Sequence, residues 1–346
     1  MSITNHLVNL GWQAYFQQQL SLEEWQNAIP ARIVAQHKSE VLVSGDFDTL
    51  HLALLASMPK MVVGDWLLLN SEQHFLRLLE RKTCFSRKGS GREVQQQLIA
   101  ANVDTAFIVC SMNDDFNLNR IERYLAVVNE SQAEAVVVLS KSDLAQEPQR
   151  FIDEVQSLGK WLAVEAVNAL DTEAVSRLQP WVKTGRTVAV LGSSGVGKST
   201  LINTLMGEQA QLTGAIREDD SKGRHTTTSR ALLALSSGGL LLDTPGMREI
   251  QLADCDNGLS VTFADIEELA NSCRFSDCQH QNEPGCAVNT AVQRGELDER
   301  RVHNYVKLRR EEALNSASLK EKRAKDKALG KYYKRTMIDS RKLKGR

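Results

Sequence analysis

The stretch Gly192-Ser-Ser-Gly-Val-Gly-Lys-Ser199 decides the fold of this chain. It matches the phosphate-binding pattern G-x-x-x-x-G-K-[ST], between an expected strand at Thr187–Leu191 and an expected helix that begins near Ser199. Lys198 would neutralise the β and γ phosphates, and the Ser199 hydroxyl would bind Mg²⁺. A chance match in a turn is the alternative, but the flanking strand and helix argue against it. The residues expected to bind nucleotide here are Gly192, Ser193, Ser194, Gly195, Val196, Gly197, Lys198, Ser199 and Thr200.

Two further phosphate-side motifs follow this loop. Asp243-Thr-Pro-Gly246 forms the D-x-x-G pattern after an apolar strand. Asp243 would contact Mg²⁺ through water, and the Gly246 N–H would meet the γ-phosphate. The segment Gly223-Arg-His-Thr-Thr-Thr228 lies between the loop and this motif. Its Thr227 would bind Mg²⁺ when the γ-phosphate is present. A polar surface loop is the alternative.

The motif expected to read the base precedes the phosphate-binding loop in the chain. Ser140-Lys-Ser-Asp143 stands where the pattern Asn-Lys-x-Asp is expected, at the end of a strand. Asp143 would accept two hydrogen bonds from guanine, a pattern that adenine cannot supply, and Lys141 would cover the base. Ser140 reaches less far than Asn, which bears on guanine affinity more than on guanine choice. We expect Ser140, Lys141, Ser142 and Asp143 to bind the nucleotide, with a last base contact from Ala166-Val-Asn-Ala169.

This order of motifs predicts a circular permutation, because the base-reading motif usually follows the phosphate-binding loop. The expected strands still suffice for one Ras-like sheet if the chain is cut between the D-x-x-G motif and residue 105. These strands are Thr105–Cys110, Ala135–Leu139, Leu162–Glu165, Thr187–Leu191, Ala231–Leu235 and Leu240–Leu242, with a helix over 119–129.

Five short β-prone runs upstream predict a small barrel. An OB-fold fits their number and the turn signals between them, and another small β-barrel is the alternative. The runs are Ala31–Ala35, Glu40–Val43, Leu50–Leu54, Trp66–Leu69 and Phe75–Leu79.

Three cysteines and a histidine near the C-terminal end have the spacing of a metal site. Cys273, Cys278, His280 and Cys286 lie within fourteen residues. Zn²⁺ binds four such ligands in a tetrahedron, and a full set of protein ligands is typical of a structural site. Reduced cysteines that bind no metal are the alternative.

The composition excludes two classes of protein. Six cysteines in 346 residues do not form the dense framework of a secreted disulfide scaffold. The N-terminal stretch does not have the pattern of a signal peptide, and the longest apolar runs are too short to span a bilayer. We therefore expect a cytoplasmic protein without a membrane partner.

Charge is distributed unevenly along the chain. Residues 301–346 hold 16 Lys or Arg against 5 Asp or Glu, whereas the other 300 residues hold 26 against 38. A basic tail on an acidic body indicates a polyanionic partner such as RNA. Candidate RNA contacts are the barrel, the basic residues Arg87, Lys88 and Arg92, and the tail Lys320–Arg346. For the tail, a solvated extension is the alternative.

These motifs divide the chain into five regions of a multi-domain α/β protein. We expect an N-terminal helical extension (1–30), an OB-fold-like β-barrel (31–86), a basic linker (87–103), a circularly permuted Ras-like P-loop domain (104–250) and a C-terminal helical zinc-binding domain with a basic tail (251–346).

The segments Arg-His-Thr-Thr-Thr (224–228) and Asp-Thr-Pro-Gly-Met-Arg-Glu (243–249) are especially similar to the ribosome small subunit-dependent GTPase A family. The resemblance covers nearly the whole chain. It implies GTP hydrolysis stimulated by the 30S ribosomal subunit and a role late in maturation of that subunit. We expect GTP to bind with Mg²⁺, and the protein to bind the 16S rRNA of the subunit. We expect a monomer with one structural Zn²⁺.

His225 is the catalytic candidate. Ras-like proteins orient water with a Gln just after D-x-x-G, but Met247 occupies that position and cannot do so. An imidazole can orient water or accept its proton, and in the resembled family the corresponding histidine is implicated in hydrolysis. A solvent-exposed or RNA-facing histidine is the alternative.

Two other functions compete with a small-subunit GTPase. One is an RNA-binding protein with zinc and OB modules that holds GTP as a slow switch ligand. The other is a GTPase that acts on tRNA or another ribonucleoprotein.

Overall fold

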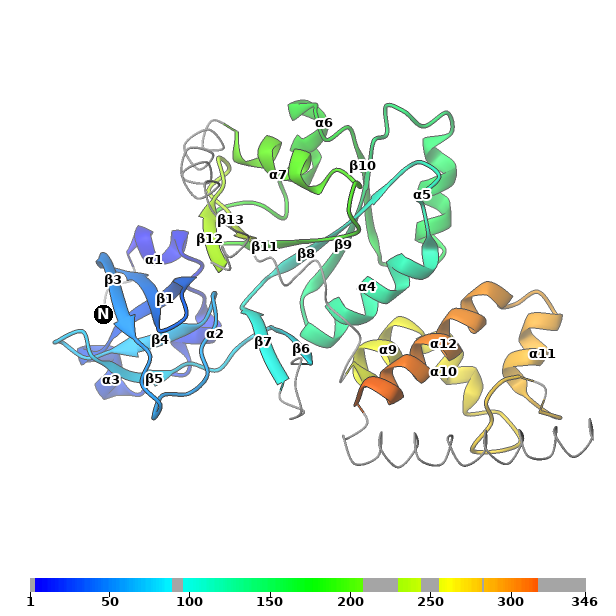
Figure 1. Cartoon of the computed structure of the whole chain (residues 1–346), viewed down its shortest axis with the longest axis horizontal. Helices are drawn as coiled ribbons and strands as arrows, with labels where there is room; N and C mark the ends of the chain where they lie inside the picture. Colours follow the sequence, from blue (N-terminus) through cyan, green and yellow to red (C-terminus); the bar gives the residue numbers. More distant parts are fainter. Residues whose placement is uncertain (1–3, 89–95, 208–229, 244–254, 282, 317–346) are drawn as a thin grey trace, which may run out of the picture.

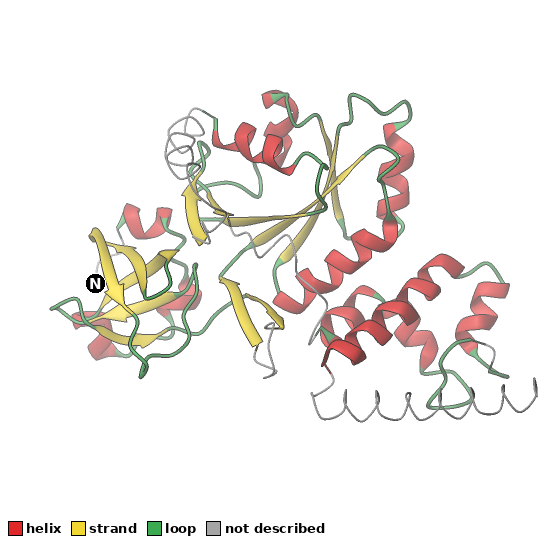
Figure 2. Cartoon of the chain, viewed as in Figure 1, coloured by secondary structure: helices red, strands yellow, loops and turns green. Residues whose placement is uncertain are grey.

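The computed structural model describes residues 4–88, 96–207, 230–243, 255–281 and 283–316 (Figure 1). A β-barrel with short helices, a larger sheet covered by helices, and a C-terminal group of helices follow one another along the molecule (Figure 2). These parts confirm the predicted multi-domain α/β fold.

The N-terminal barrel has the strand connections of an OB-like fold. β1 pairs with both β2 and β4, β2 pairs with β3, and β4 pairs with β5, all antiparallel. Side chains of β2 alternate between buried and half-buried positions, as expected for a strand with one face on a core. The strands are β1 (Ile29–Gln36), β2 (Glu40–Gly45), β3 (Phe47–Ala53), β4 (Trp66–Leu69) and β5 (Phe75–Leu78).

Three short helices precede this barrel in the chain and share a core with it. They are α1 (Asn5–Asn9), α2 (Ala14–Gln17) and α3 (Leu22–Asn27). Trp12 and Phe16 pack on Trp66 of β4, with ring centroids 4.9 Å and 5.7 Å away. These aromatic contacts give the N-terminal helices and the barrel a common apolar core.

A buried arginine ties the barrel to the start of the larger sheet. Arg32 of β1 is 1% exposed and donates to the carbonyl oxygens of Leu10 at 2.5 Å and Asn102 at 3.0 Å. Burial lowers the pKa of Arg32 to about 10, and nearby Asp104 and Asp65 partly counteract that shift. The guanidinium thus joins three stretches that are far apart in the sequence.

The predicted basic linker over 87–103 is partly wrong. Strands β6 (Cys84–Lys88) and β7 (Gln96–Ala101) pair antiparallel as a separate two-stranded sheet. The linker was predicted because residues 87–95 are basic and rich in glycine. The apolar side chains of Phe85, Ile99 and Ala100, which are fully or almost fully buried, drive the strand pairing instead.

The larger sheet has the permuted Ras-like order. Its strands run β10-β9-β8-β11-β13-β12, the first five parallel and β12 antiparallel to β13. β11, which leads into the phosphate-binding loop, lies inside the sheet although three of these strands precede it in the chain. The strands are β8 (Thr105–Ser111), β9 (Glu134–Ser140), β10 (Ala163–Val167), β11 (Thr187–Leu191), β12 (Arg230–Ala234) and β13 (Leu240–Asp243).

Helices cover both faces of this sheet (Figure 1). Two hydrophobic clusters lie on its opposite faces, one toward α4 and one toward α6 and α7. The helices are α4 (Leu118–Ser131), α5 (Pro148–Gln156), α6 (Thr172–Val175), a 3₁₀ turn (Ser176–Leu178) and α7 (Lys198–Met206).

The barrel and the Ras-like sheet are hydrogen-bonded into one continuous sheet. β1 pairs with β12, with Ala35 opposite Ala231 and Gln36 opposite Arg230. The barrel is therefore attached directly to the strand that follows the predicted Mg²⁺-binding segment 223–228.

The C-terminal helices are α9 (Asp256–Thr262), α10 (Ala264–Ala270), α11 (Ala287–Gln293) and α12 (Glu299–Ser316). α9 packs so closely on α4 that a Cβ atom at Gly258 would lie 2.0 Å from the Ala126 carbonyl oxygen. All four lie within the region 251–346 that was predicted to be helical, and residues 317–346 of the basic tail lie outside the described residues. Among the helices described, none is long and apolar enough to cross a membrane.

Candidate functional site

The phosphate-binding loop has the backbone shape that its glycines allow. Gly192, Gly195 and Gly197 have φ angles of +141°, +81° and +92°, which side chains with a Cβ rarely adopt. A Cβ at Gly192 would lie only 2.4 Å from the Val109 carbonyl oxygen of β8. The loop therefore needs glycine at this position, and it leads directly into α7 at Lys198.

Lys198 lies inside the curve of the loop. Its side chain is buried, and its ammonium donates to the Ser193 carbonyl oxygen at the start of the same loop. Ser194, Gly195 and Ser199 are exposed. The loop thus combines a held ammonium group with accessible backbone and an accessible hydroxyl, as phosphate and Mg²⁺ binding requires.

The predicted base-reading motif lies against this loop. Ser140 is fully buried at the end of β9 and donates from its hydroxyl to the Val196 carbonyl oxygen at 2.5 Å. Lys141 has a left-handed backbone (φ +59°) and donates from Nζ to the Gly195 carbonyl oxygen at 2.9 Å. The structure therefore brings together two motifs more than fifty residues apart.

Asp143 and the 166–169 segment complete this edge of the sheet. Asp143 is exposed and follows Ser142, whose N–H donates to the Val167 carbonyl oxygen at 3.4 Å. The Thr204 hydroxyl of α7 donates to the Ala169 carbonyl oxygen at 2.6 Å. The segment expected to make the last base contact is therefore held beside both the base-reading motif and the helix after the loop.

Ser140 fastens the base-reading strand to the phosphate-binding loop. Ser140→Ala would leave the Val196 carbonyl without this donor, at a cost of about 1 kcal/mol. We expect GDP to bind about fivefold more weakly, as measured by calorimetric titration. Ser157→Ala removes a comparable hydroxyl-to-carbonyl bond, 2.7 Å to Glu154, on the exposed end of α5 and should bind GDP as the parent does. Equal affinities of parent and Ser140→Ala would contradict this role.

Arg120 is a residue that the sequence interpretation missed. It lies in the first turn of α4, and its Nη1 donates to the Ser193 hydroxyl at 2.8 Å and to Asp115 Oδ2 at 2.9 Å. Its position just after β8 is the sequence signal that could have identified it, because β8 lies beside β11, the strand that leads into the loop.

Several predicted residues cannot be placed in this site. His225, Thr227 and Gly246 lie outside the described residues. Asp243 is described only as the last residue of β13, a strand that lies beside β11.

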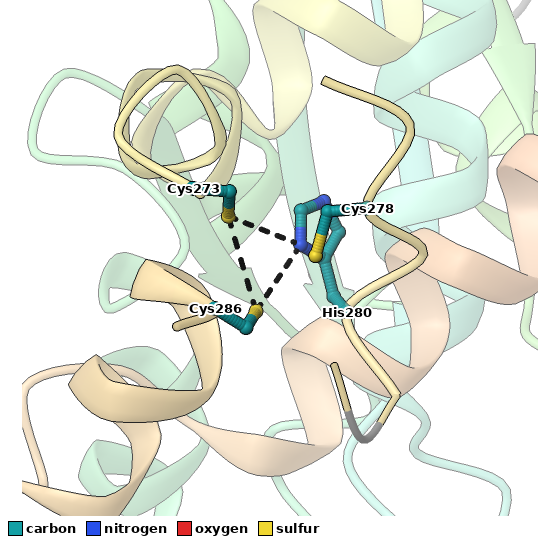
Figure 3. A group of neighbouring side chains, drawn as sticks. All are labelled: Cys273, Cys278, His280 and Cys286. Carbon is teal, nitrogen blue, oxygen red and sulfur yellow. Dashed lines mark hydrogen bonds between the residues drawn. The ribbon is translucent and has the colours of Figure 1, made fainter. Parts of the chain in front are cut away.

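The predicted metal ligands converge from three segments (Figure 3). Cys273 follows α10, Cys278 and His280 lie in the next loop, and Cys286 caps the N-terminus of α11. The four ligand atoms all lie within 4.8 Å of one another. Cys273 Sγ lies 3.9 Å from Cys286 Sγ, and His280 Nδ1 lies 3.7 Å and 3.5 Å from these two sulfurs.

The three separations among Cys273, His280 and Cys286 fit a tetrahedral zinc site, and the Cys278 sulfur lies within 4.8 Å of these atoms. Zn–S bonds of about 2.3 Å and Zn–N bonds of about 2.0 Å place ligand atoms about 3.5–3.8 Å apart. Burial raises the pKa of Cys278 to about 12. Burial also raises the pKa of Cys273, but hydrogen bonds from the N–H groups of Val288 and Ala287 and from the neighbouring thiols outweigh it, so the net shift of Cys273 is downward. A lower pKa favours the thiolate that binds metal. The donor set and its geometry could therefore hold one Zn²⁺.

Comparison with known proteins agrees with this arrangement. Residues 78–253 match the RsgA GTPase family. The chain is 55% identical to the small ribosomal subunit biogenesis GTPase RsgA 2 of Vibrio parahaemolyticus over 342 residues, which cover 99% of this chain and 96% of that protein. It is 45% identical to small ribosomal subunit biogenesis GTPase RsgA of Xanthomonas campestris over 323 residues, covering 89% and 86% of the two chains.

Solved structures show the same fold. YjeQ from Thermotoga maritima is 25% identical with a TM-score of 0.60, over 81% of this chain and 97% of that one. The circularly permuted GTPase YloQ is 24% identical with a TM-score of 0.58, over 83% and 96%. With its permuted sheet, its phosphate-binding loop and these similarities, the chain belongs to the RsgA GTPase family of GTP-hydrolysing enzymes.

Proposed function

We propose that this protein hydrolyses GTP on the small ribosomal subunit, as a factor in the late maturation of that subunit. The 55% identity to a small ribosomal subunit biogenesis GTPase over 99% of the chain carries the proposal. The juxtaposition of the base-reading motif and the phosphate-binding loop supports it, because a single nucleotide can reach both.

Within the site, we assign the phosphates to the loop 192–200 and guanine to Asp143, with Lys141 over the base. Lys198 would neutralise the phosphates, and Ser199 would bind Mg²⁺ together with Thr227 and, through water, Asp243. The buried Ser140 takes a supporting role, since its hydroxyl donates to the loop.

We assign water activation to His225, because Met247 cannot orient water in the manner of the Ras glutamine. The intrinsic rate should then be low, and the ribosomal subunit would complete the active site. Its 16S rRNA is the proposed polyanionic partner of the barrel and the basic tail. A monomeric cytoplasmic protein with one structural Zn²⁺ fits this role.

GTP hydrolysis measured at low salt with and without purified 30S subunits tests the proposal. We expect strong stimulation by 30S subunits and none by 50S subunits, and no turnover of ATP. His225→Ala should bind GTP normally and lose the stimulated rate.

The alternatives give different outcomes. GTP binding without stimulated turnover would favour an RNA-binding protein that uses GTP as a slow switch ligand. Stimulation by tRNA, or by another ribonucleoprotein in place of 30S subunits, would assign the enzyme to a different RNA. Either result would overturn the proposal.

A further inference from the structure

A charged side chain outside the nucleotide-binding motifs touches the phosphate-binding loop. Arg120 is the third residue of α4, and the Asn117 side chain caps this helix by accepting from the Arg120 N–H at 3.1 Å. The Arg120 side chain is 35% exposed, so water reaches it only in part. The rigid first turn of α4 therefore aims the guanidinium at the loop.

Two contacts hold this guanidinium in place. Nη1 of Arg120 donates to Asp115 Oδ2 at 2.9 Å and to the Ser193 hydroxyl at 2.8 Å. Asp115 belongs to the turn that joins β8 to α4, and Asn113 fixes this turn by accepting from the Asp115 N–H at 3.1 Å. The carboxylate thus orients the arginine, and the arginine reaches the second residue of the loop.

Ser193 contacts both Arg120 and the loop lysine, Lys198. Its side chain accepts from Arg120, while its carbonyl oxygen accepts from the Lys198 ammonium. Because one residue makes both contacts, a change in the backbone torsion angles of Ser193 would move both the hydroxyl that Arg120 holds and the carbonyl that orients Lys198. A chain of contacts therefore runs from Asp115 through Arg120 and Ser193 to Lys198.

We propose that Arg120 is a positioning residue for nucleotide binding, which holds Ser193 so that its carbonyl directs the Lys198 ammonium toward the β and γ phosphates. This inference rests on the phosphate-binding role proposed above for Lys198. Arg120 acts through Ser193 and needs no contact with the nucleotide. Its planar guanidinium suits this task, because one NH₂ group can serve two acceptors in a fixed direction.

Nucleotides with different numbers of phosphates distinguish this positioning role from a general structural role. A general structural defect would weaken the binding of all of them equally. Lys198 is assigned to the β and γ phosphates, so GMP, which lacks both, should not depend on its orientation. Arg120→Ala should weaken binding of GDP and of a non-hydrolysable GTP analogue about tenfold and leave GMP affinity unchanged. Arg120→Lys keeps the charge without the planar fork and should fall between the two.

A double-mutant cycle tests the route through Ser193. Ser193→Ala alone should weaken GDP binding about as much as Arg120→Ala, and the double variant should be no weaker than either single one. Arg150→Ala is the matched control, since its exposed guanidinium on α5 bonds only Glu154 among the contacts described. Affinities would come from calorimetry on the full-length protein.

Three results would overturn the inference. These are unchanged GDP affinity in Arg120→Ala, an equal loss for GMP and GDP, and additive losses in the double variant. Lys198→Ala in the same assay separates this failure from a failure of the proposed site. If Lys198→Ala loses GDP affinity and Arg120→Ala does not, only the role of Arg120 is wrong; if Lys198→Ala binds GDP normally, the phosphate assignment itself is wrong.

Discussion

Cys286→Ser is expected to reduce bound zinc from one ion per chain to almost none and to unfold the loop that carries the other ligands. Cys286 is 3% exposed, and its sulfur lies 3.5 Å from His280 Nδ1. It also accepts from the Asn289 N–H at 3.4 Å, so metal binding and the start of α11 depend on one side chain. Structural zinc contributes about 10–16 kcal/mol of apparent binding free energy in zinc-finger peptides, which makes this the largest loss anticipated.

Two measurements check this expectation on the full-length protein. Elemental analysis gives the zinc content, and hydrogen exchange should show loss of protection over residues 273–293. Cys84→Ser is the matched control, because Cys84 is a half-buried cysteine in β6 and outside the metal cluster. One zinc per chain in Cys286→Ser, with unchanged exchange, would show that the cluster does not bind the ion.

Elements with a strong local signal were predictable from the sequence. The strands Trp66–Leu69 and Thr187–Leu191 have the predicted bounds, and the others expected in the barrel and the sheet differ by at most three residues at either end. The metal cluster was also predictable, because its ligands lie within fourteen residues and the spacing itself restricts the geometry.

Contacts between distant segments were not predictable in the same way. The pairing of β1 with β12 depends on which sheet edge the barrel meets, and nothing within either strand encodes that choice. Arg120 reaches the loop because β8 and β11 are neighbours, which the permuted sheet order decides. Ser140 was interpreted as a shorter base-contacting residue, but its buried hydroxyl donates to the Val196 carbonyl.

A contact between residues far apart in the sequence also attaches the C-terminal helices to the Ras-like domain. Glu122 of α4 has a fully buried side chain that accepts from Arg300 at 2.9 Å, Arg301 at 2.7 Å and Asn304 at 2.5 Å. Burial lowers the pKa of Arg301, but Asp265 and Glu122 outweigh it and the pKa lies above its ordinary value. One carboxylate of α4 therefore binds three side chains of α12.

Glu122→Gln is expected to loosen this attachment while it preserves side-chain volume. Asp265 would still pair with Arg301, but the amide removes the buried charge that balances Arg300, and its NH₂ group cannot accept a hydrogen bond as the second carboxylate oxygen does. We expect a cost of about 3 kcal/mol, the lower end for breaking a buried ion pair from one side. Some backbone amides of α9 and α12 exchange their hydrogens only when these helices separate from α4. If the variant lowers the free energy of this separation by about 3 kcal/mol, these amides should exchange about 150-fold faster. Hydrogen exchange with mass spectrometry measures this change, and zinc content should stay at one per chain because the metal ligands are untouched.

Glu311→Gln provides the comparison within the same interface. Glu311 of α12 pairs with Arg123 of α4, and both side chains are 29% exposed, so water screens this pair. Its loss should cost about 1 kcal/mol or less. A larger effect of Glu122→Gln than of Glu311→Gln would show that the buried carboxylate with its three partners, and not the exposed pair, holds the C-terminal helices on α4. Equal exchange rates in the two variants would contradict that conclusion, since both remove one carboxylate charge between α4 and α12.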